Sequence, residues 1–302
     1  MQLDLFEDNR PGILLNIADE FIRSRDFVQA VSVYEQLLAD YPNDRHPAAL
    51  LKLVGEWLDL ISRADEDPGN PSPLLTIWLG LESICHPALH SAVLGLLIDK
   101  LRSLPNPELI YTPPRFHLGH ALIKAGQYAA AADCFHDALL AGGIERGKFL
   151  AWQGDALTLA GDSKAALKSY LTAFLDDPLT VDMQSVANRK ISDLYASMHY
   201  ETTDEIEDDE ISAWLPVWGW LHGVFPLPMH AVAEKPSFSL EEFEEIISKM
   251  SSPVPRIWYD MLTYAERMRN MHQDELASVR RLMKKTNGFM FGCYMEKISG
   301  RR

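Results

Sequence analysis

The chain has 302 residues, of which 47% are hydrophobic and 24% charged, so it can bury a sizeable core and is not disordered overall. Its formal net charge of −15 argues against nucleic-acid binding, which needs a basic face. The first residues lack a basic segment followed by an apolar run, and no stretch of about 18 apolar residues occurs, so we expect neither a signal peptide nor a membrane span.

The three cysteines indicate the compartment. Cys85, Cys134 and Cys293 are odd in number and far apart in the chain. This usage is typical of reduced thiols rather than of a disulfide framework. We therefore expect a soluble, cytoplasmic protein.

The first predicted element is a helical hairpin at residues 11–44. Its apolar and small residues recur at helical intervals, and Pro42 prevents the second helix from continuing. Arg25 stands where the chain would turn between the two helices. The positions that carry the pattern are Leu14, Ile17, Ala18, Phe21, Ala30, Tyr34 and Leu37.

Residues 45–111 are predicted to be helical without a clear motif. Apolar stripes indicate helices at about 50–61, 74–85 and 87–104, and the turn-rich stretch DEDPGNPSP separates the first two. The length would hold two degenerate repeat units of about 34 residues each.

Residues 112–146 and 147–180 form two hairpins with the same pattern. Gly119 and Gly126 of the first hairpin are each 35 residues before Gly154 and Gly161 of the second, and the same spacing separates Ala131 from Ala166 and Phe135 from Tyr170. Gly126 and Gly161 lie between apolar runs, where a left-handed turn suits glycine. Gly119, Gly154 and the two alanines mark close helix contacts, and Phe135 and Tyr170 fill the wedge between hairpins.

This order of large, small and helix-ending positions resembles the tetratricopeptide repeat, a helix–turn–helix unit of about 34 residues. The resemblance implies an all-α fold, an α–α superhelix in which the first helix of each unit lines a concave groove. The charged and aromatic residues that it places in this groove are Asp19, Arg23, Phe116, His120, Lys124, Lys148 and Asp155. Groove residues of this kind bind an extended peptide or a partner helix.

One subfamily of these repeats binds the C-terminal carboxylate of chaperones through a lysine and asparagine clamp. Phe116 and His120 occupy positions where that clamp would use a lysine and an asparagine, and only Lys148 resembles a clamp residue. The sequence therefore disfavours chaperone-tail binding.

A helix at residues 182–199 is predicted to cap the repeat region, which we assign to residues 1–200. The atypical remainder, 201–302, begins with an acidic run and the apolar stretch AWLPVWGWLHGVFPLP. Its aromatic residues either pack against the repeats or form an exposed patch for a partner or a second copy. The patch would consist of Trp214, Trp218, Trp220 and Phe225.

Three further helices are expected in the C-terminal region. The stretch SLEEFEEIISKM begins with Ser239, a plausible N-cap, and carries acidic residues in its first turn. Apolar periodicity indicates helices at about 255–270 and 274–285.

No catalytic motif, cofactor site or metal site is evident. Nucleophile elbows, phosphate-binding glycine loops, HExxH and CxxC pairs are missing. The spacing of His117 from His120, and of His86 from His90, puts each pair on one helix face, but no third ligand completes either pair.

The leading hypothesis is therefore a non-enzymatic scaffold that binds another protein. The alternatives are a homo-oligomeric protein that associates through the Trp-rich segment, and an enzyme with an unrecognised site in the C-terminal region.

Overall fold

The computed structural model describes residues 9–67, 69–142, 145–202, 205–227, 238–249, 254–269 and 271–300. In these ranges the regular structure is helical, and the one isolated β-bridge joins Thr112 to Phe116. The chain forms two compact units, Met1–Cys134 and Phe135–Arg302. The division falls inside α7 (Tyr128–Ala141), whereas the expected domain boundary lay between residues 200 and 201.

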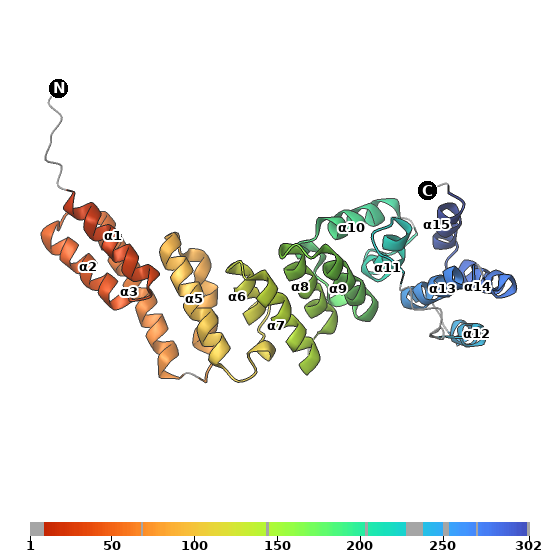
Figure 1. The fold of residues 1–302 in the computed structure, drawn as a ribbon, viewed down its shortest axis with the longest axis horizontal. Coiled ribbons are helices and arrows are strands. Elements are labelled where there is room, and N and C mark those ends of the chain that lie inside the picture. The colour runs from red at the N-terminus through yellow and green to blue at the C-terminus, as the bar shows by residue number, and fades with distance from the viewer. Residues whose placement is uncertain are drawn as a thin grey trace, which may run out of the picture. The chain divides into compact units, whose positions relative to one another are not determined.

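The first unit begins with the predicted hairpin of α1 (Arg10–Arg23) and α2 (Phe27–Asp40), which pack together, with α3 (Arg45–Glu66) against α2 (Figure 1). Asp26 caps α2 by accepting a hydrogen bond from the backbone nitrogen of Gln29. The helix ends at Asp40, two residues before Pro42, as the sequence predicts.

The three helices predicted in 45–111 are present. They are α3, α4 (Ser72–Gly80) and α5 (Pro87–Ser103). The first unit also contains the 3₁₀ turns η1 (Leu81–Ser83) and η2 (Pro107–Leu109), the short helix α6 (Leu118–Lys124) and the start of α7. The helix α3 is longer than its apolar stripe because Asp44 caps it by accepting from the backbone of His46.

Three interhelix turns have the same geometry. Arg25, Gly126 and Gly161 have φ values of 65°, 73° and 86°. In each turn the left-handed residue donates to the carbonyl three residues earlier, and the following residue donates to the carbonyl five residues earlier. This is the Schellman arrangement, which satisfies carbonyls at the helix end. The structure confirms the predicted glycine turns, and Arg25 adopts the same conformation without being glycine.

In the second unit, α8 (Arg146–Leu159) packs along α9 (Ser163–Asp176). The ring of Tyr170 covers Gly154, confirming that this glycine marks a close helix contact. Phe135 is buried, with its ring centroid 6.1 Å from that of Phe149 and 5.9 Å from that of Trp152. The predicted wedge role of Phe135 is therefore confirmed.

The predicted capping helix begins later than expected. Residues 178–180 and 183–185 form the 3₁₀ turns η3 (Pro178–Thr180) and η4 (Met183–Ser185), and α10 spans Arg189–Glu201. Asn188 starts the helix by accepting from the backbone of Lys190. The extended segment before it is held on α8, where Asp155 accepts from the backbone of Ala187 at 2.7 Å and Thr158 from the side chain of Asn188 at 3.0 Å.

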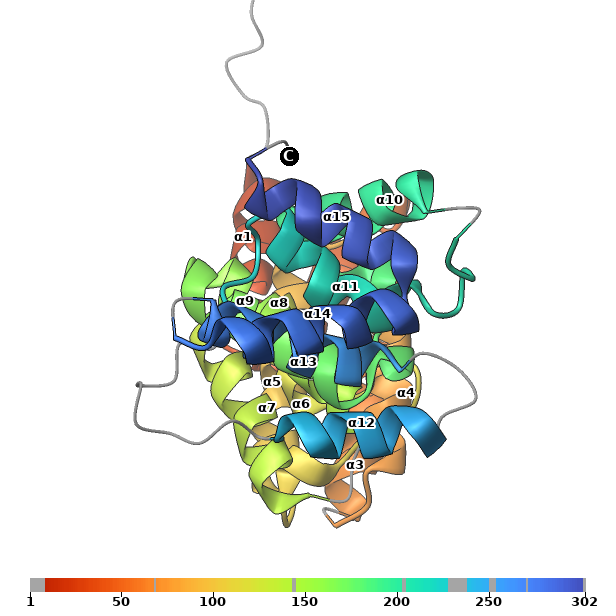
Figure 2. The ribbon, with the colours of Figure 1, turned by 90° about the vertical axis from the view of Figure 1, so that its right-hand side faces the viewer.

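The Trp-rich stretch forms α11 (Ile211–Leu221), which contacts α9, α10 and α13. Four further helices follow in the sequence (Figure 2): α12 (Leu240–Lys249), α13 (Pro255–Met268), α14 (Gln273–Thr286) and α15 (Gly288–Ile298). Ser239 caps α12 reciprocally with Glu242, confirming the predicted N-cap. One hydrophobic core runs from Tyr170 through Trp214 and Trp258 to Tyr294, so residues beyond 201 fold with α8 and α9.

Candidate protein-binding surfaces

The predicted groove residues of α1 lie in an ion-pair cluster within the first unit. Asp19 lies 3.8 Å from the guanidinium of Arg23 and 3.2 Å from Nε2 of His86, at the start of α5. The side chain of Arg23 is 64% exposed. Lys124 of α6 pairs with Glu82, whose carboxyl pKa this contact lowers, and its ammonium lies 5.9 Å from the ring centroid of Trp78. Among the predicted groove residues Asp19, Arg23 and Lys124, Arg23 therefore presents the most accessible charge.

Two predicted groove residues of the first unit are buried, which corrects their assignment to the groove surface. Phe116 precedes α6 and is 1% exposed, because its backbone pairs with Thr112 and the helix starts only at Leu118. His120 is 9% exposed, and burial lowers its pKa to about 3, with the nearby His117 adding to the effect. These two side chains therefore pack inside the first unit and are not accessible to a partner.

His117 belongs to the start of α6 rather than to a metal site. Its Nδ1 accepts from the backbone nitrogen of Gly119 at 2.9 Å, and Nε2 lies 2.7 Å from the carbonyl oxygen of Glu108. The two contacts fit the neutral imidazole with the proton on Nε2. In the same way Nδ1 of His86 caps α5 by accepting from the backbone of Leu89. Both rings therefore have structural roles at helix N-termini.

In the second unit, Lys148 lies at the start of α8 and pairs with Glu145. Asp155 is 8% exposed and accepts hydrogen bonds from the hydroxyl of Tyr170 and the backbone of Ala187, which corrects its assignment to an open groove. Burial and the neighbouring carboxylate raise the pKa of Tyr170. Segment 186–188 of the same unit thus lies against the face of α8 that the resemblance assigned to a partner.

The exposed aromatic patch, one of the two alternatives for the Trp-rich segment, is not observed. Trp214, Trp218 and Phe225 are at most 1% exposed, because α11 buries them in the core of the second unit. Trp220 is partly buried, with the ammonium of Lys297 5.1 Å from its ring centroid. The alternative in which these rings pack against the repeats is the one observed.

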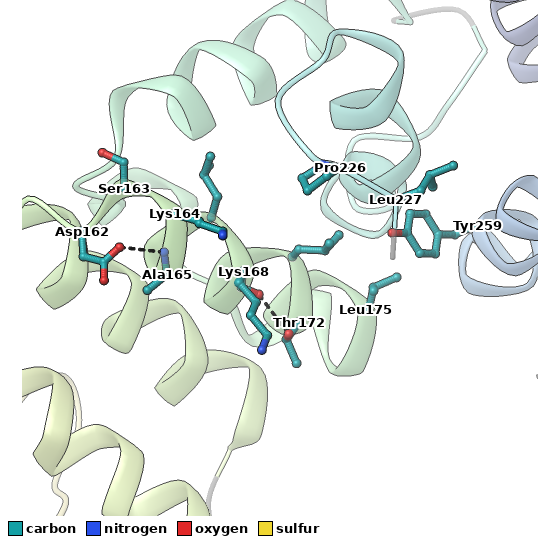
Figure 3. A pocket seen from close by; sticks show the side chains of 12 residues that line it. Asp162, Ser163, Lys164, Ala165, Lys168, Thr172, Leu175, Pro226, Leu227 and Tyr259 are labelled. Atoms are coloured by element: carbon teal, nitrogen blue, oxygen red, sulfur yellow. Dashed lines mark hydrogen bonds between the residues drawn. The ribbon is translucent and has the colours of Figure 1, made fainter. Parts of the chain in front are cut away.

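A groove that the sequence did not predict runs along α9. Leu167, Leu171 and Leu175 are four residues apart, so they form one row on this helix. Pro226 and Leu227 form the opposite wall and Tyr259 of α13 closes one end (Figure 3), giving a cavity of about 890 Å³. We call this the α9 groove.

The walls of the α9 groove are fixed by the core. Phe225 lies with its ring centroid 6.4 Å from that of Phe174, and a Cβ on Gly219 would come within 2.2 Å of the Phe225 ring. Gly223, with φ of 73°, ends α11 and turns the chain toward Pro226. Arg256 of α13 donates to the carbonyl of Leu175 at 3.2 Å, which joins α13 to the end of α9. The groove is therefore preformed.

Besides Asp162, Ser163 and Thr172, the polar residues that line the α9 groove are Lys164, Lys168 and Tyr259. Lys164 and Lys168 are exposed and form no ion pair among the residues that the structure describes. Tyr259 is only 3% exposed, its hydroxyl has no hydrogen-bond partner in the described part of the chain, and in Figure 3 it points toward α9. Burial raises the pKa of Tyr259 to about 12, with Asp260 adding to the effect, so the phenol is a proton donor at neutral pH.

Within the described ranges, no three His, Cys, Asp or Glu side chains are arranged to hold a metal ion. The helices described there are too short or too polar to cross a membrane.

The described residues define an all-α protein built from helical hairpins, and one segment resembles a known repeat family. Residues 116–178 match the family model of the tetratricopeptide repeat, a span that ends with α9 and Pro178. This segment is similar to the tetratricopeptide repeat, and such repeats generally mediate protein–protein interaction. No curated protein and no solved structure gives a significant match.

Proposed function

We propose that this protein is a non-enzymatic scaffold that binds another protein through the first helices of its repeats. The observation that carries the proposal is the pair of consecutive tetratricopeptide repeats at residues 116–178. Three matching Schellman turns support extending the repeat geometry to the hairpin of α1 and α2. Stacked repeats of this kind create extended concave surfaces that bind partners.

The proposed partner contacts are the charged positions that stay accessible on the predicted groove helices. Arg23 is exposed, and Lys124 and Lys148 have side-chain exposures of 26% and 22%. Each of these basic side chains would complement an acidic group of the partner. We also propose a cytoplasmic location, on the basis of the odd, widely spaced cysteines.

Affinity capture from the source cell tests the proposal. The intact chain is compared with Arg23→Glu/Lys124→Glu/Lys148→Glu, and with the control Lys52→Glu/Lys284→Glu/Lys285→Glu, which makes the same change of charge at exposed positions elsewhere. We expect one partner that the intact chain and the control capture and the groove variant does not. Equal capture by all three folded proteins would overturn the assignment to these residues.

A further inference from the structure

The α9 groove is a second surface, which the proposed function does not use. Its row of leucines is partly buried and packs at the edge of the core that contains Ala166, Tyr170 and Ala173, which are fully buried. A volume of about 890 Å³ lies in the range of ligand-binding pockets in proteins. Since Phe225 and Arg256 fix its walls, the apolar surface is available without rearrangement of the chain.

We propose that the α9 groove binds a short, acidic, amphipathic helix of a partner protein. Three features of the groove determine this occupant: the spacing of its leucines, the charge at its edge and the polar group at its end.

The length of the apolar row fits a helix. Leu167 and Leu175 are eight residues apart on α9, which is about 12 Å at about 1.5 Å per residue. A partner helix that presents apolar side chains at i, i+4 and i+7 spans about the same distance.

The apolar surface along the floor of the groove also favours a helix over an extended peptide. A helix satisfies its own backbone hydrogen bonds, whereas an extended peptide needs a strand edge or side-chain partners. The described residues contain no strand, and three leucines and Ala165 give the α9 wall its apolar surface. An extended peptide would therefore leave buried backbone groups unpaired, which is costly.

The charges favour an acidic partner. Lys164 and Lys168 lie one turn apart on α9. Asp162, the acidic residue of the lining, caps α9 by accepting from the backbone of Ala165 at 3.0 Å. A chain of net charge −15 thus presents a locally positive edge beside an apolar row. Carboxylates on the partner helix would pair with the two ammonium groups.

The hydroxyl of Tyr259 is the polar group at the end of the groove. A buried donor without a partner is destabilising, and a ligand that supplies an acceptor removes this cost. Because this oxygen is itself buried, the Tyr259 ring would turn toward the groove so that a Glu, Gln or Asn side chain of the partner helix accepts the hydrogen bond.

A displayed peptide library tests the proposal. The library holds 16-residue helices with apolar residues at i, i+4 and i+7 and random charge elsewhere, and it is selected against the full chain. We expect enriched peptides of net negative charge. Their affinity should fall at least tenfold for Lys164→Glu/Lys168→Glu and stay within twofold for Lys284→Glu/Lys285→Glu, the matched control.

Two further variants sharpen the test. Tyr259→Phe should weaken the enriched peptides about threefold to tenfold, and unchanged affinity would remove the hydroxyl from the site. Arg23→Glu/Lys124→Glu/Lys148→Glu should bind them normally, so that failure here and failure of the proposed function are distinguishable. Circular dichroism and thermal unfolding confirm that each variant is folded.

Other outcomes overturn the proposal. These are no enrichment over a scrambled library, and enrichment of basic peptides. Binding of dodecanoate, a carboxylate with an apolar chain, in the absence of peptide binders would assign the groove to a fatty acid. Self-association in sedimentation velocity that Lys164→Glu/Lys168→Glu abolishes would assign it to a second copy.

Discussion

The ring of Tyr170 on α9 lies directly over Gly154 on α8, so close that a Cβ on the glycine would be 2.9 Å from two ring atoms. Tyr170 is fully buried and donates its hydroxyl hydrogen bond to Asp155, the residue after the glycine. The ring cannot move aside without losing this bond. The contact between the two helices of this repeat therefore depends on the absence of a side chain at position 154.

Gly154→Ala should destabilise the second unit by about 1–3 kcal/mol, the usual cost of forcing an extra group into a packed core. The measurement is urea unfolding followed by circular dichroism. Gly292→Ala is the matched control in α15, because its Cβ would meet nothing within 4 Å. We expect this control to be stabilised by about 0.5–1 kcal/mol. Equal effects in the two variants would contradict the close contact.

Arg25 is in the left-handed region, which costs a residue with a side chain about 1–2 kcal/mol. Its guanidinium also pairs with Asp99 of α5. Arg25→Ala and Arg25→Gly both lose the ion pair, but only glycine relieves the backbone strain. Arg25→Gly should therefore be about 1 kcal/mol more stable than Arg25→Ala in the unfolding of the first unit. An alanine variant as stable as the glycine variant would be inconsistent with this turn.

Tyr259→Phe should stabilise the second unit by about 1 kcal/mol at neutral pH, because it removes a buried donor without a partner among the described residues. Tyr294→Phe is the matched control, since the hydroxyl of Tyr294 donates to Glu266 at 2.9 Å and accepts from Arg280 at 3.1 Å. It should be destabilising by about 1 kcal/mol. Thermal unfolding of both variants provides the test, and the opposite order would contradict the assigned contacts.

The same tyrosine should make stability sensitive to high pH. The pKa of Tyr259 is raised from 10.0 to about 12 in the folded chain, mainly by burial. Ionisation of this group does not change the free energy of unfolding below pH 10. The free energy of unfolding falls as the pH rises from 10 to 12, because in this interval the unfolded chain has released the proton and the folded chain has not. The fall in the free energy of unfolding over this interval should be shallower in Tyr259→Phe. An unchanged slope would show that the phenol is not buried.

His120 should make stability sensitive to low pH. Its pKa is lowered from 6.5 to about 3, so below pH 6.5 the unfolded chain binds a proton that the folded chain does not. The free energy of unfolding therefore does not depend on this group above pH 6.5. Below that pH it decreases as the pH falls toward 3, by up to about 1.4 kcal/mol per pH unit. His120→Leu should reduce this slope when unfolding is measured between pH 7 and 5. A slope equal to that of the intact chain would contradict the burial of His120.

The repeats were predictable because their signals are local. Gly126 and Gly161 mark turns that any helical hairpin of this kind needs, and Ser239 precedes a helix with acidic residues in its first turn. The pattern also indicated the first hairpin, although its turn residue is Arg25. Helix α15 was not predicted, because Gly288 and Gly292 weaken its helical pattern, and its N-cap, Asn287, is evident only in the structure.

The candidate sites were less predictable because burial depends on residues far apart in the chain. Asp155 was assigned to the groove from its place on a first helix, but segment 186–188 covers it. The sequence allowed Trp214 and Trp218 to be either buried or exposed. They are buried because α11 packs in the same core as Trp258. The α9 groove needs α9, the turn after α11 and α13 together, and no spacing within one of these segments reveals it.

The most direct test of the protein-binding scaffold is a binding isotherm between the recombinant chain and the protein that it captures. We predict a saturable complex whose dissociation constant rises at least tenfold in Arg23→Glu/Lys124→Glu/Lys148→Glu and stays within twofold in Lys52→Glu/Lys284→Glu/Lys285→Glu. The same affinity for all three proteins would contradict a role for the first helices of the repeats, and a chain that binds no protein would contradict the scaffold itself.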